Sequence, residues 1–378
     1  MKQTADFVTF EISYNFSMHI HSEVKPLTTL AIPLLFPQQL SKFSRKSMHS
    51  EVIMQFNAEN ALRQLVAKEG ARVIGADFGG DKGISQLFIV RGGRLVVVET
   101  YSDYVQSTYG DGYMDSLEKT AAYAAEHHIP VGLSWGAPLE GTKPQYHPKA
   151  MNFLKALDAK YGGDFASVIP TMAACINDGP AGLISAAIEV NRTTTATNVL
   201  FPMNGGGLNI AVLKDGEIFS NEAGHVEAVK ELNIYNQTKA CEVYGAEYVC
   251  IERLGANKAG IEAQWELLKG SYMRAVDIEV EYKAGNVLAR DLYDHSALMV
   301  AHMLAGTARA YDIDLSDPQT AIVGHGGAFK FPDYTERIHQ ILGGNGQTLP
   351  RFIATHEYTS GQSNACLDGA ALAAILAS

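Results

Sequence analysis

Residues 73–100 read VIGADFGGDKGISQLFIVRGGRLVVVET and give the first indication of the fold. One apolar run ends at Asp77, a turn with two glycines, Asp81 and Lys82 follows, and a second apolar run begins. Glycines let backbone N–H groups approach a ligand closely, and a carboxylate beside such a turn can hold Mg²⁺ through water. A polar β-turn without a ligand is the alternative. The stretch therefore predicts a β-hairpin whose bend either binds a ligand or only reverses the chain.

The composition of the 378-residue chain is typical of a turn-rich α/β protein, with 47% apolar residues, 19% charged residues and 35 glycines. This length allows two ordinary domains. The formal net charge of −11 argues against nucleic acid or an anionic membrane as the main partner, because phosphate groups bind basic surfaces. The cysteines are too few and too scattered for a disulfide framework and indicate a reducing compartment: Cys175, Cys241, Cys250 and Cys366.

The first 50 residues are irregular, and their pattern assigns them no function. Their most apolar stretch, LTTLAIPLLF at 27–36, contains Pro33 and is too short to span a bilayer. It does not follow a basic start, and no small-residue cleavage site comes after it, so it is a poor secretory signal. We therefore expect a cytoplasmic protein.

The first half of the chain alternates strands and helices. A helix is predicted over 57–70, opened by Asn57 as N-cap and closed by Gly70. Strands over 72–77, 85–91 and 94–100 form a meander. Further along we expect helices over 115–128, 148–162 and 179–190, the last with Pro180 near its first turn, and strands over 130–135 and 165–176.

The second half repeats this pattern, because a strand over 198–203, a glycine turn and a strand over 208–219 match the opening hairpin. Two such halves predict a duplicated α/β architecture with a cleft between them. Helices are then expected over 239–255, 261–270, 289–313, 334–342 and from about 362, and strands over 320–329 and 351–356. The expected segments are an N-terminal extension of uncertain role (1–70), an N-terminal α/β domain (71–190), a C-terminal α/β domain (191–360) and a final helix packing back on the first domain (361–378).

Asn177 and Asp178 stand where a predicted strand meets a predicted helix. An ionised aspartate there can take a proton from a substrate hydroxyl. The alternative is a simple helix cap, since both residue types satisfy the first N–H groups of a helix.

The sequence NEAGHVEA places Glu222 and His225 three residues apart, with Gly224 leaving room beside them. Two hydrogen-bonding groups of different character suit a polyol, although His225 could equally be a metal ligand or a surface histidine. Cys241 and Cys250 suggest zinc together with His225, but structural zinc usually takes four ligands with closely spaced cysteine pairs. A spacing of nine disfavours structural zinc, so no metal ligand is assigned.

The sequence IVGHGGAF contains Gly324, Gly326 and Gly327 after an apolar strand. Such glycines can lie flat against a planar ligand or begin a helix whose N–H groups face a phosphate.

Taken in chain order, these motifs resemble the ROK family (repressors, open reading frames and sugar kinases) over residues 72–378. The resemblance implies an α/β, two-domain actin-like ATPase (ribonuclease H-like) sugar kinase fold with an interdomain cleft. The motifs that match are DFGGDK with Asp77, Gly79, Gly80 and Lys82; Asn177–Asp178; Glu222, Gly224 and His225; Glu252 two places after Cys250; and GHGGAF.

The resemblance also implies roles. Asp77 would hold the Mg²⁺ of ATP, and Asp178 would accept the proton of the attacking sugar hydroxyl. Sugar hydroxyls would be bound by Asn177, Glu222, His225 and Glu252, and the pocket around Trp135, Gly136 and Ala137 would choose the epimer. The nucleotide side would comprise Gly79, Gly80, Lys82, Gly205, Gly206, Gly326 and Gly327.

Three departures from the family pattern fall mainly on the nucleotide side. The second phosphate loop reads FPMNGGG at 201–207, so that Phe201 adds bulk where phosphates would lie and Pro202 lacks an N–H donor. Val243 and Gly245 stand at the places of two zinc-binding cysteines. Asp81 replaces a threonine and adds negative charge beside a phosphate site.

The expected function is ATP- and Mg²⁺-dependent phosphorylation of a hexose or N-acetylhexosamine, with Asp178 as general base. The altered loop leaves open another phosphoryl donor or a sugar-binding relative that no longer transfers phosphate. A repressor is the least favoured reading, because the first 70 residues lack a helix-turn-helix pattern and the chain is acidic. A homodimer or higher homo-oligomer is implied by the resemblance.

Overall fold

The computed structural model describes residues 42–79, 83–105, 111–145, 150–228, 232–233, 241, 249–343, 349, 352–359 and 364–378. Several predictions therefore lie outside the described residues. They concern residues 1–41, Gly80, Asp81 and Lys82 of the first turn, Val243 and Gly245 of the zinc motif, and most of the helix expected over 239–255.

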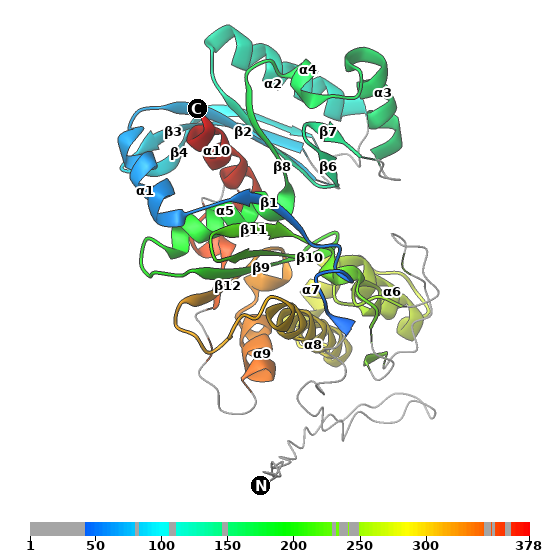
Figure 1. Ribbon diagram of the computed structural model, residues 1–378. Helices are drawn as coiled ribbons and strands as arrows, with labels where there is room; N and C mark the ends of the chain where they lie inside the picture. The colour runs from blue at the N-terminus through cyan, green and yellow to red at the C-terminus, as the bar shows by residue number, and fades with distance from the viewer. Residues whose placement is uncertain are drawn as a thin grey trace, which may run out of the picture.

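Two β-sheets with the same strand order form the framework (Figure 1). Each contains three consecutive antiparallel strands followed by two parallel ones, and the second sheet has β1 as an additional antiparallel edge strand, so the duplication predicted from the two glycine hairpins is confirmed. In spatial order the first sheet contains β4 (Arg94–Val105), β3 (Gly83–Arg91), β2 (Arg72–Phe78), β5 (Val131–Trp135) and β8 (Met172–Asn177). The second contains β1 (Glu51–Gln55), β11 (Glu217–Ser220), β10 (Leu208–Lys214), β9 (Asn198–Asn204), β12 (Thr320–Gly324) and β13 (Phe352–Ala354).

Helices form three layers around these sheets. The outer face of the first sheet is covered by α2 (Asp111–His127), α3 (Met151–Tyr161) and α4 (Phe165–Val168). The outer face of the second is covered by α6 (Lys258–Lys269), α7 (Ala275–Lys283), α8 (Val287–Ala310) and α9 (Pro332–Leu342). Between the sheets lie α1 (Ala58–Ala67), α5 (Asp178–Val190) and α10 (Ala365–Ala377) (Figure 1). Short elements are β6 (Leu139–Glu140), β7 (Lys143–Pro144), η3 (Ala223–His225), η5 (Glu252–Leu254), η6 (Ala328–Lys330) and η7 (Thr355–Glu357).

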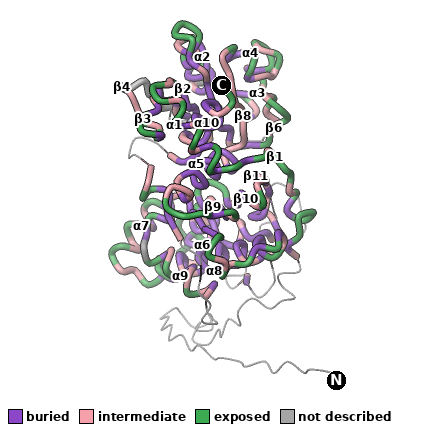
Figure 2. Tube along the Cα trace, turned by 60° about the vertical axis from the view of Figure 1, so that its left-hand side comes forward, coloured by how far each residue is buried: buried purple, intermediate pink, exposed green. Residues whose placement is uncertain are grey.

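Within the central layer, α5 and α10 are buried almost throughout, as Figure 2 shows. Small residues allow this, because a Cβ on Gly132 of β5 would overlap the carbonyl of Ala370 in α10. A Cβ on Gly369 would likewise overlap the carbonyl of Ala181 in α5. The glycine- and alanine-rich sequence of α10 thus lets it lie directly against both the first sheet and α5.

Most predicted elements are confirmed, including the helix capped by Asn57, whose side chain accepts from Asn60 N at 2.8 Å. The single strand expected over 165–176 is wrong, because Asp164 caps the short helix α4 before β8 begins. The strand expected over 208–219 is also divided, since Asp215 and Gly216 adopt positive φ and reverse the chain between β10 and β11. Helix α7 had not been predicted.

Candidate active site

The first glycine turn begins with a carboxylate that is held by neutral donors. Asp77 ends β2 and is 6% exposed. Its Oδ1 accepts a hydrogen bond from Ser134 Oγ at 2.8 Å, and its Oδ2 accepts one from Asn364 Nδ2 at 3.2 Å. Tyr113 Oη donates to the Gly79 carbonyl at 2.6 Å. Because both donors to the carboxylate are uncharged, the negative charge of Asp77 is not neutralised by them.

Asp178 and the first turn meet at Gly136. A Cβ on Gly136 would lie 3.0 Å from Gly79 Cα and 3.6 Å from Asp178 Oδ2. Asp178 Oδ1 accepts from Gly179 N at 2.8 Å, which fixes the carboxylate at the head of α5. The pKa of Asp178 is raised to about 7, mainly because the carboxylate is buried and secondly because the charge of Asp77 is nearby. A carboxylate with this pKa can exchange a proton near neutral pH.

Asn177 holds the loop beside Asp178. Its Nδ2 donates to the carbonyls of Trp135 and Ala137, at 3.2 and 3.1 Å, and its Oδ1 accepts from Gly179 N. Both amide hydrogens are thus used within the protein. The structure brings Asn177, Gly136 and Ala137 together, with Asn177 in a supporting position.

Glu222, His225 and Glu252 form a second group of polar side chains, in the C-terminal half. His225 Nε2 lies 3.9 Å from Glu222 Oε2 and 3.8 Å from Glu252 Oε2. Glu222 Oε2 accepts from Asn209 Nδ2, and Glu252 Oε2 accepts from Leu208 N. Both glutamates are therefore anchored to β10.

The ionisation of this group is linked to Asp178. Burial, then the charges of Asp178 and Glu252, raise the pKa of Glu222 to about 8. Burial, then Arg253, lowers the pKa of His225 to about 4, so its ring is neutral at pH 7. Asp178 thus contributes to the raised pKa of Glu222, although the residues are 44 positions apart in sequence.

A third group consists of His225, Cys241 and Cys250. His225 Nδ1 lies 3.4 Å from Cys241 Sγ and 3.9 Å from Cys250 Sγ, and all three ligand atoms lie within 4.8 Å of one another. The spacing of nine therefore does not keep the cysteines apart. The described residues supply three nitrogen or sulfur ligands of the four that structural zinc takes.

The second glycine turn is attached to the start of α6. Asn257 Nδ2 donates to the Gly206 carbonyl at 3.1 Å, and Lys258 N donates to the Gly205 carbonyl at 3.3 Å. Gly326 approaches the same turn, because a Cβ there would overlap the Asn204 carbonyl. Gly205, Gly206 and Gly326 thus lie together, and Gly327 follows directly before η6.

Phe201 does not project from this turn, which corrects the sequence interpretation. Its ring is 0% exposed and fills the space left by Gly182 of α5, stacked on His325 with ring centroids 5.8 Å apart. Pro202 lies within β9. Its carbonyl accepts a hydrogen bond from His325 N, and its own nitrogen has no hydrogen to donate. Met203, the next residue of this loop, packs towards Gly179 of α5, where its Cε would lie 3.3 Å from an added Cβ.

The residues that support Asp77 and Gly79 were not found from the sequence. Ser134 is a polar residue inside an apolar strand, and Asn364 caps α10 far along the chain. In the sequence, only Ser134 signalled a partner for Asp77, because a hydroxyl inside a buried strand needs a hydrogen-bond partner.

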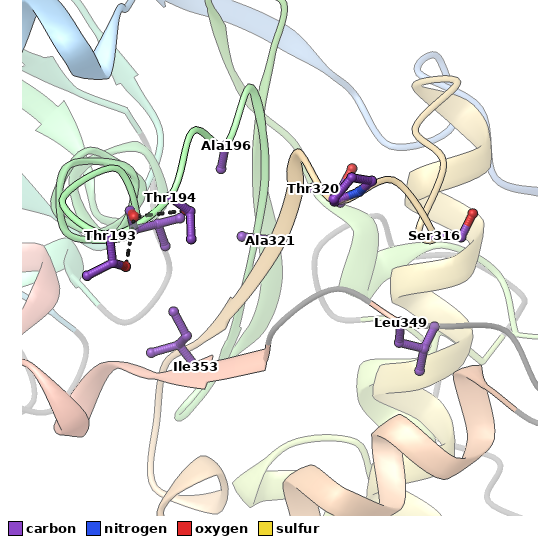
Figure 3. Close-up of a pocket in the computed structure, with 10 residues that line it drawn as sticks. Thr193, Thr194, Ala196, Ser316, Thr320, Ala321, Leu349 and Ile353 are labelled. Atoms are coloured by element: carbon purple, nitrogen blue, oxygen red, sulfur yellow. Dashed lines mark hydrogen bonds between the residues drawn. The ribbon is translucent and has the colours of Figure 1, made fainter.

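The cavity shown in Figure 3 lies elsewhere. It has a volume of about 270 Å³ and lies beyond the end of α5, next to β12 and β13. Its lining is mostly apolar and includes Thr193, Thr194, Ala321 and Ile353, and the two threonine hydroxyls bond to the Val190 carbonyl. It contains none of the titratable groups described above.

Comparisons with known proteins give matches in structure only: no protein-family model matches the sequence, and no curated protein matches it. A ROK hexokinase from Thermus thermophilus shares 20% identity at a TM-score of 0.56, covering 81% of this chain and 98% of that one. A ROK family glucokinase from Streptomyces griseus, in complex with glucose and AMPPNP, shares 16% at 0.53, covering 80% and 98%. A ROK family transcriptional regulator, a homologue of the E. coli MLC protein, shares 15% at 0.55, covering 82% and 80%.

These matches establish that the chain has the α/β actin-like ATPase fold of ROK proteins, as the motifs predicted. Among the described residues, no helix combines the length and apolarity needed to cross a bilayer.

Proposed function

We propose that this chain, which has the ROK fold, is a sugar kinase that transfers the γ-phosphoryl group of Mg²⁺-ATP to a hydroxyl of a hexose or N-acetylhexosamine. The observation that supports this most is the position of Asp178. Its carboxylate adjoins Gly79 and Gly136, and its charge contributes to the raised pKa of Glu222. A base beside a glycine turn supports phosphoryl transfer to a hydroxyl, which depends mainly on positioning.

Asp178 is the general base in this proposal. The sugar hydroxyl donates a hydrogen bond to Asp178, which accepts the proton as the oxygen attacks phosphorus. The hydrogen bond from Gly179 N keeps Oδ1 in place, so Oδ2, which lies towards Gly136, is the atom assigned to the proton. Gly136 leaves the space for the substrate, since a side chain there would contact both Gly79 and Asp178.

Asp77 is proposed to hold Mg²⁺ through water. Its buried carboxylate fits such a cation, because hard metals prefer oxygen ligands. Bound Mg²⁺ would neutralise phosphate charge during transfer. Tyr113 fixes the Gly79 carbonyl and thereby the first turn. The nucleotide is assigned to Gly79, Gly80 and Lys82 and to the second turn.

Sugar hydroxyls are proposed to bind Glu222, His225 and Glu252. The neutral His225 ring can donate or accept, and the glutamates are held by β10 with acceptor capacity remaining. Asn177 is assigned a positioning role instead, because its amide hydrogens already hold the carbonyls of the 135–137 loop.

A non-catalytic sugar sensor is the second candidate. The fold also occurs in a ROK family transcriptional regulator, and Met203 packs against Gly179 where the family loop has a small residue. In that case the Glu222, His225 and Glu252 group would bind sugar without transfer.

Calorimetry with a panel of hexoses and N-acetylhexosamines, with and without Mg²⁺-ATP, separates the two candidates, together with an assay for ADP release. A kinase releases ADP with at least one sugar, and inorganic polyphosphate should be included as a donor. Sugar binding without nucleotide binding or transfer would favour the sensor. Binding of neither ligand would reject both.

Zinc at His225, Cys241 and Cys250 is tested by metal analysis of the purified protein. Because the three ligand atoms already converge, we expect bound zinc. Cys241→Ser and Cys250→Ser should lose it and unfold at lower temperature, whereas Cys175→Ser, outside the group, should retain it. If the purified protein contains no zinc and all three variants are as stable as the wild type, the inference from the spacing of nine, which disfavours structural zinc, holds.

The assembly and environment are also proposals. As the resemblance implies, we propose a cytoplasmic homodimer or higher homo-oligomer that acts on a small-molecule sugar, with neither nucleic acid nor membrane as partner. Light scattering of the purified chain measures the assembly directly.

A further inference from the structure

Residues 42–50, called the N-terminal arm below, precede β1 and pack on the C-terminal half of the molecule. They lie before the first ROK motif, which begins at Asp77. The arm has an ordered turn of its own, because Ser44 N donates to Ser47 Oγ and Ser47 N donates to Ser44 Oγ. Ser50 N then donates to the Arg45 carbonyl at 2.9 Å.

Two apolar side chains anchor the arm to α8. The Phe43 ring is 5% exposed and occupies the notch left by Gly306, where a Cβ would overlap it. It also meets the His302 ring edge-on, with centroids 5.4 Å apart. Met48 is 0% exposed, and Thr307 Oγ1 donates to its sulfur at 3.7 Å. Burial of a phenylalanine and a methionine makes this attachment stable.

The arm reaches the loop that carries the proposed sugar ligands. Glu222 N donates to the Met48 carbonyl at 2.7 Å. On one side of this bond, Glu51 of β1 pairs with Ser220 of β11. On the other, Lys42 Nζ lies 2.8 Å from Glu227, a half-exposed ion pair that adds little by itself. The arm therefore contacts the 220–227 segment at Glu222 and at Glu227, and β1, which directly follows the arm, pairs with the start of that segment.

We propose that the N-terminal arm is a positioning element for the sugar site and that it fixes the backbone of Glu222 through the Met48 carbonyl. Its effect on sugar affinity rests on the proposed function. The main-chain bond sets the direction of Glu222, whose carboxylate is held separately by Asn209. Loss of the arm removes the bond to Glu222 N and leaves Glu222 held by Asn209 and His225 alone among these contacts. Sugar binding therefore weakens, while nucleotide binding, which uses other elements, does not.

Gly306→Ala tests this without altering the arm. The added methyl group displaces Phe43 from its notch, while alanine is a better helix former than glycine and favours α8 itself. Phe43→Ala removes the anchor from the other side. Phe88→Ala is the matched control, because Phe88 is 1% exposed in β3 and lies in the core between the sheets.

Two measurements are made on full-length protein. Hydrogen exchange of the Glu222 amide should accelerate in Gly306→Ala and Phe43→Ala relative to Phe88→Ala at matched thermal stability. The sugar Kd or KM should rise about three- to tenfold, as expected for one weakened hydrogen bond, with kcat and the KM for ATP unchanged.

The outcomes separate the inference from the proposed function. Unchanged exchange at Glu222 in both variants would overturn the positioning role, whether or not any sugar binds. Faster exchange with unaltered sugar affinity would overturn the link to the site. If the wild-type chain binds no sugar, the proposed function fails, and exchange at Glu222 still decides whether the arm holds that backbone.

Discussion

The two glycine turns start the two halves of the molecule in the same topological position, yet they differ in charge. The first follows Asp77, whose carboxylate receives two neutral hydrogen bonds. The second follows Asn204, whose Nδ2 donates to the Ala256 carbonyl at 2.6 Å and to Tyr334 Oη at 2.9 Å. Asn204 is 4% exposed and its amide is used inside the domain.

On the proposed function, this difference gives each turn its own role. The strand before the first turn carries the carboxylate of Asp77, and the strand before the second carries the amide of Asn204, while Glu252 Oε2 accepts from Leu208 N at the end of the second turn. We propose a cation at the first turn, because a carboxylate oxygen is a ligand that hard cations prefer.

Asp178→Asn is expected to have the largest effect, because it removes the proposed base at the point where the two halves meet. Phosphoryl transfer should fall by about 10³-fold, while sugar affinity is retained. The control is Asp164→Asn, which alters another aspartate at a helix start but lies at α4. Turnover unchanged by Asp178→Asn would remove this residue from the base role.

Phe201→Ala tests whether the altered second loop obstructs the nucleotide. Since the ring is fully buried against α5, the substitution should lower the free energy of unfolding by about 3 kcal/mol or more. ATP affinity should not improve, as measured by calorimetry beside chemical denaturation. A gain in ATP affinity at little cost in stability would show that the ring does occupy the phosphate site.

Exchanging the residues before the two turns sharpens the comparison directly. Asn204→Asp places a carboxylate in a buried network and should lower the free energy of unfolding by about 2 kcal/mol. Asp77→Asn should leave stability nearly unchanged but abolish Mg²⁺-dependent transfer. Denaturation and Mg²⁺ titration of both variants measure this, and equal stability effects would contradict the assigned difference between the turns.

The pH dependence should show the smallest effect. Because burial and Asp77 raise the pKa of Asp178 from 3.8 to about 7, the native state holds a proton that the unfolded state has released. Stability from this group therefore falls as pH rises from about 4 to about 7. The free energy of unfolding of Asp178→Asn minus that of the wild type should therefore be greater at pH 8 than at pH 5, by about 1 kcal/mol or more.

For kinetics the same pKa has the opposite consequence, since the base must be ionised. We expect kcat/KM to rise with pH and to level off above about pH 7. A profile that is flat between pH 5 and pH 8, or a stability difference that does not change with pH, would contradict the raised pKa.

Local sequence patterns determined most of the elements. Asn57 capped α1 as predicted, although the helix ended at Ala67, before the predicted stop at Gly70. The two glycine hairpins revealed the duplication, because caps, turns and side-chain periodicity act within a few residues. The order of the motifs also indicated the fold that the structural comparisons establish.

Tertiary structure decided what depends on residues far apart in the chain. The direction of Phe201 was fixed by Gly182, a glycine on another element that leaves room for the ring. Cys241 and Cys250 came together around His225 despite their spacing, and the arm reached Glu222 across nearly half of the sequence. The sequence by itself thus determined the elements and their order, and only packing decided which side chains meet, because side-chain contacts depend on the shapes of distant neighbours rather than on local periodicity.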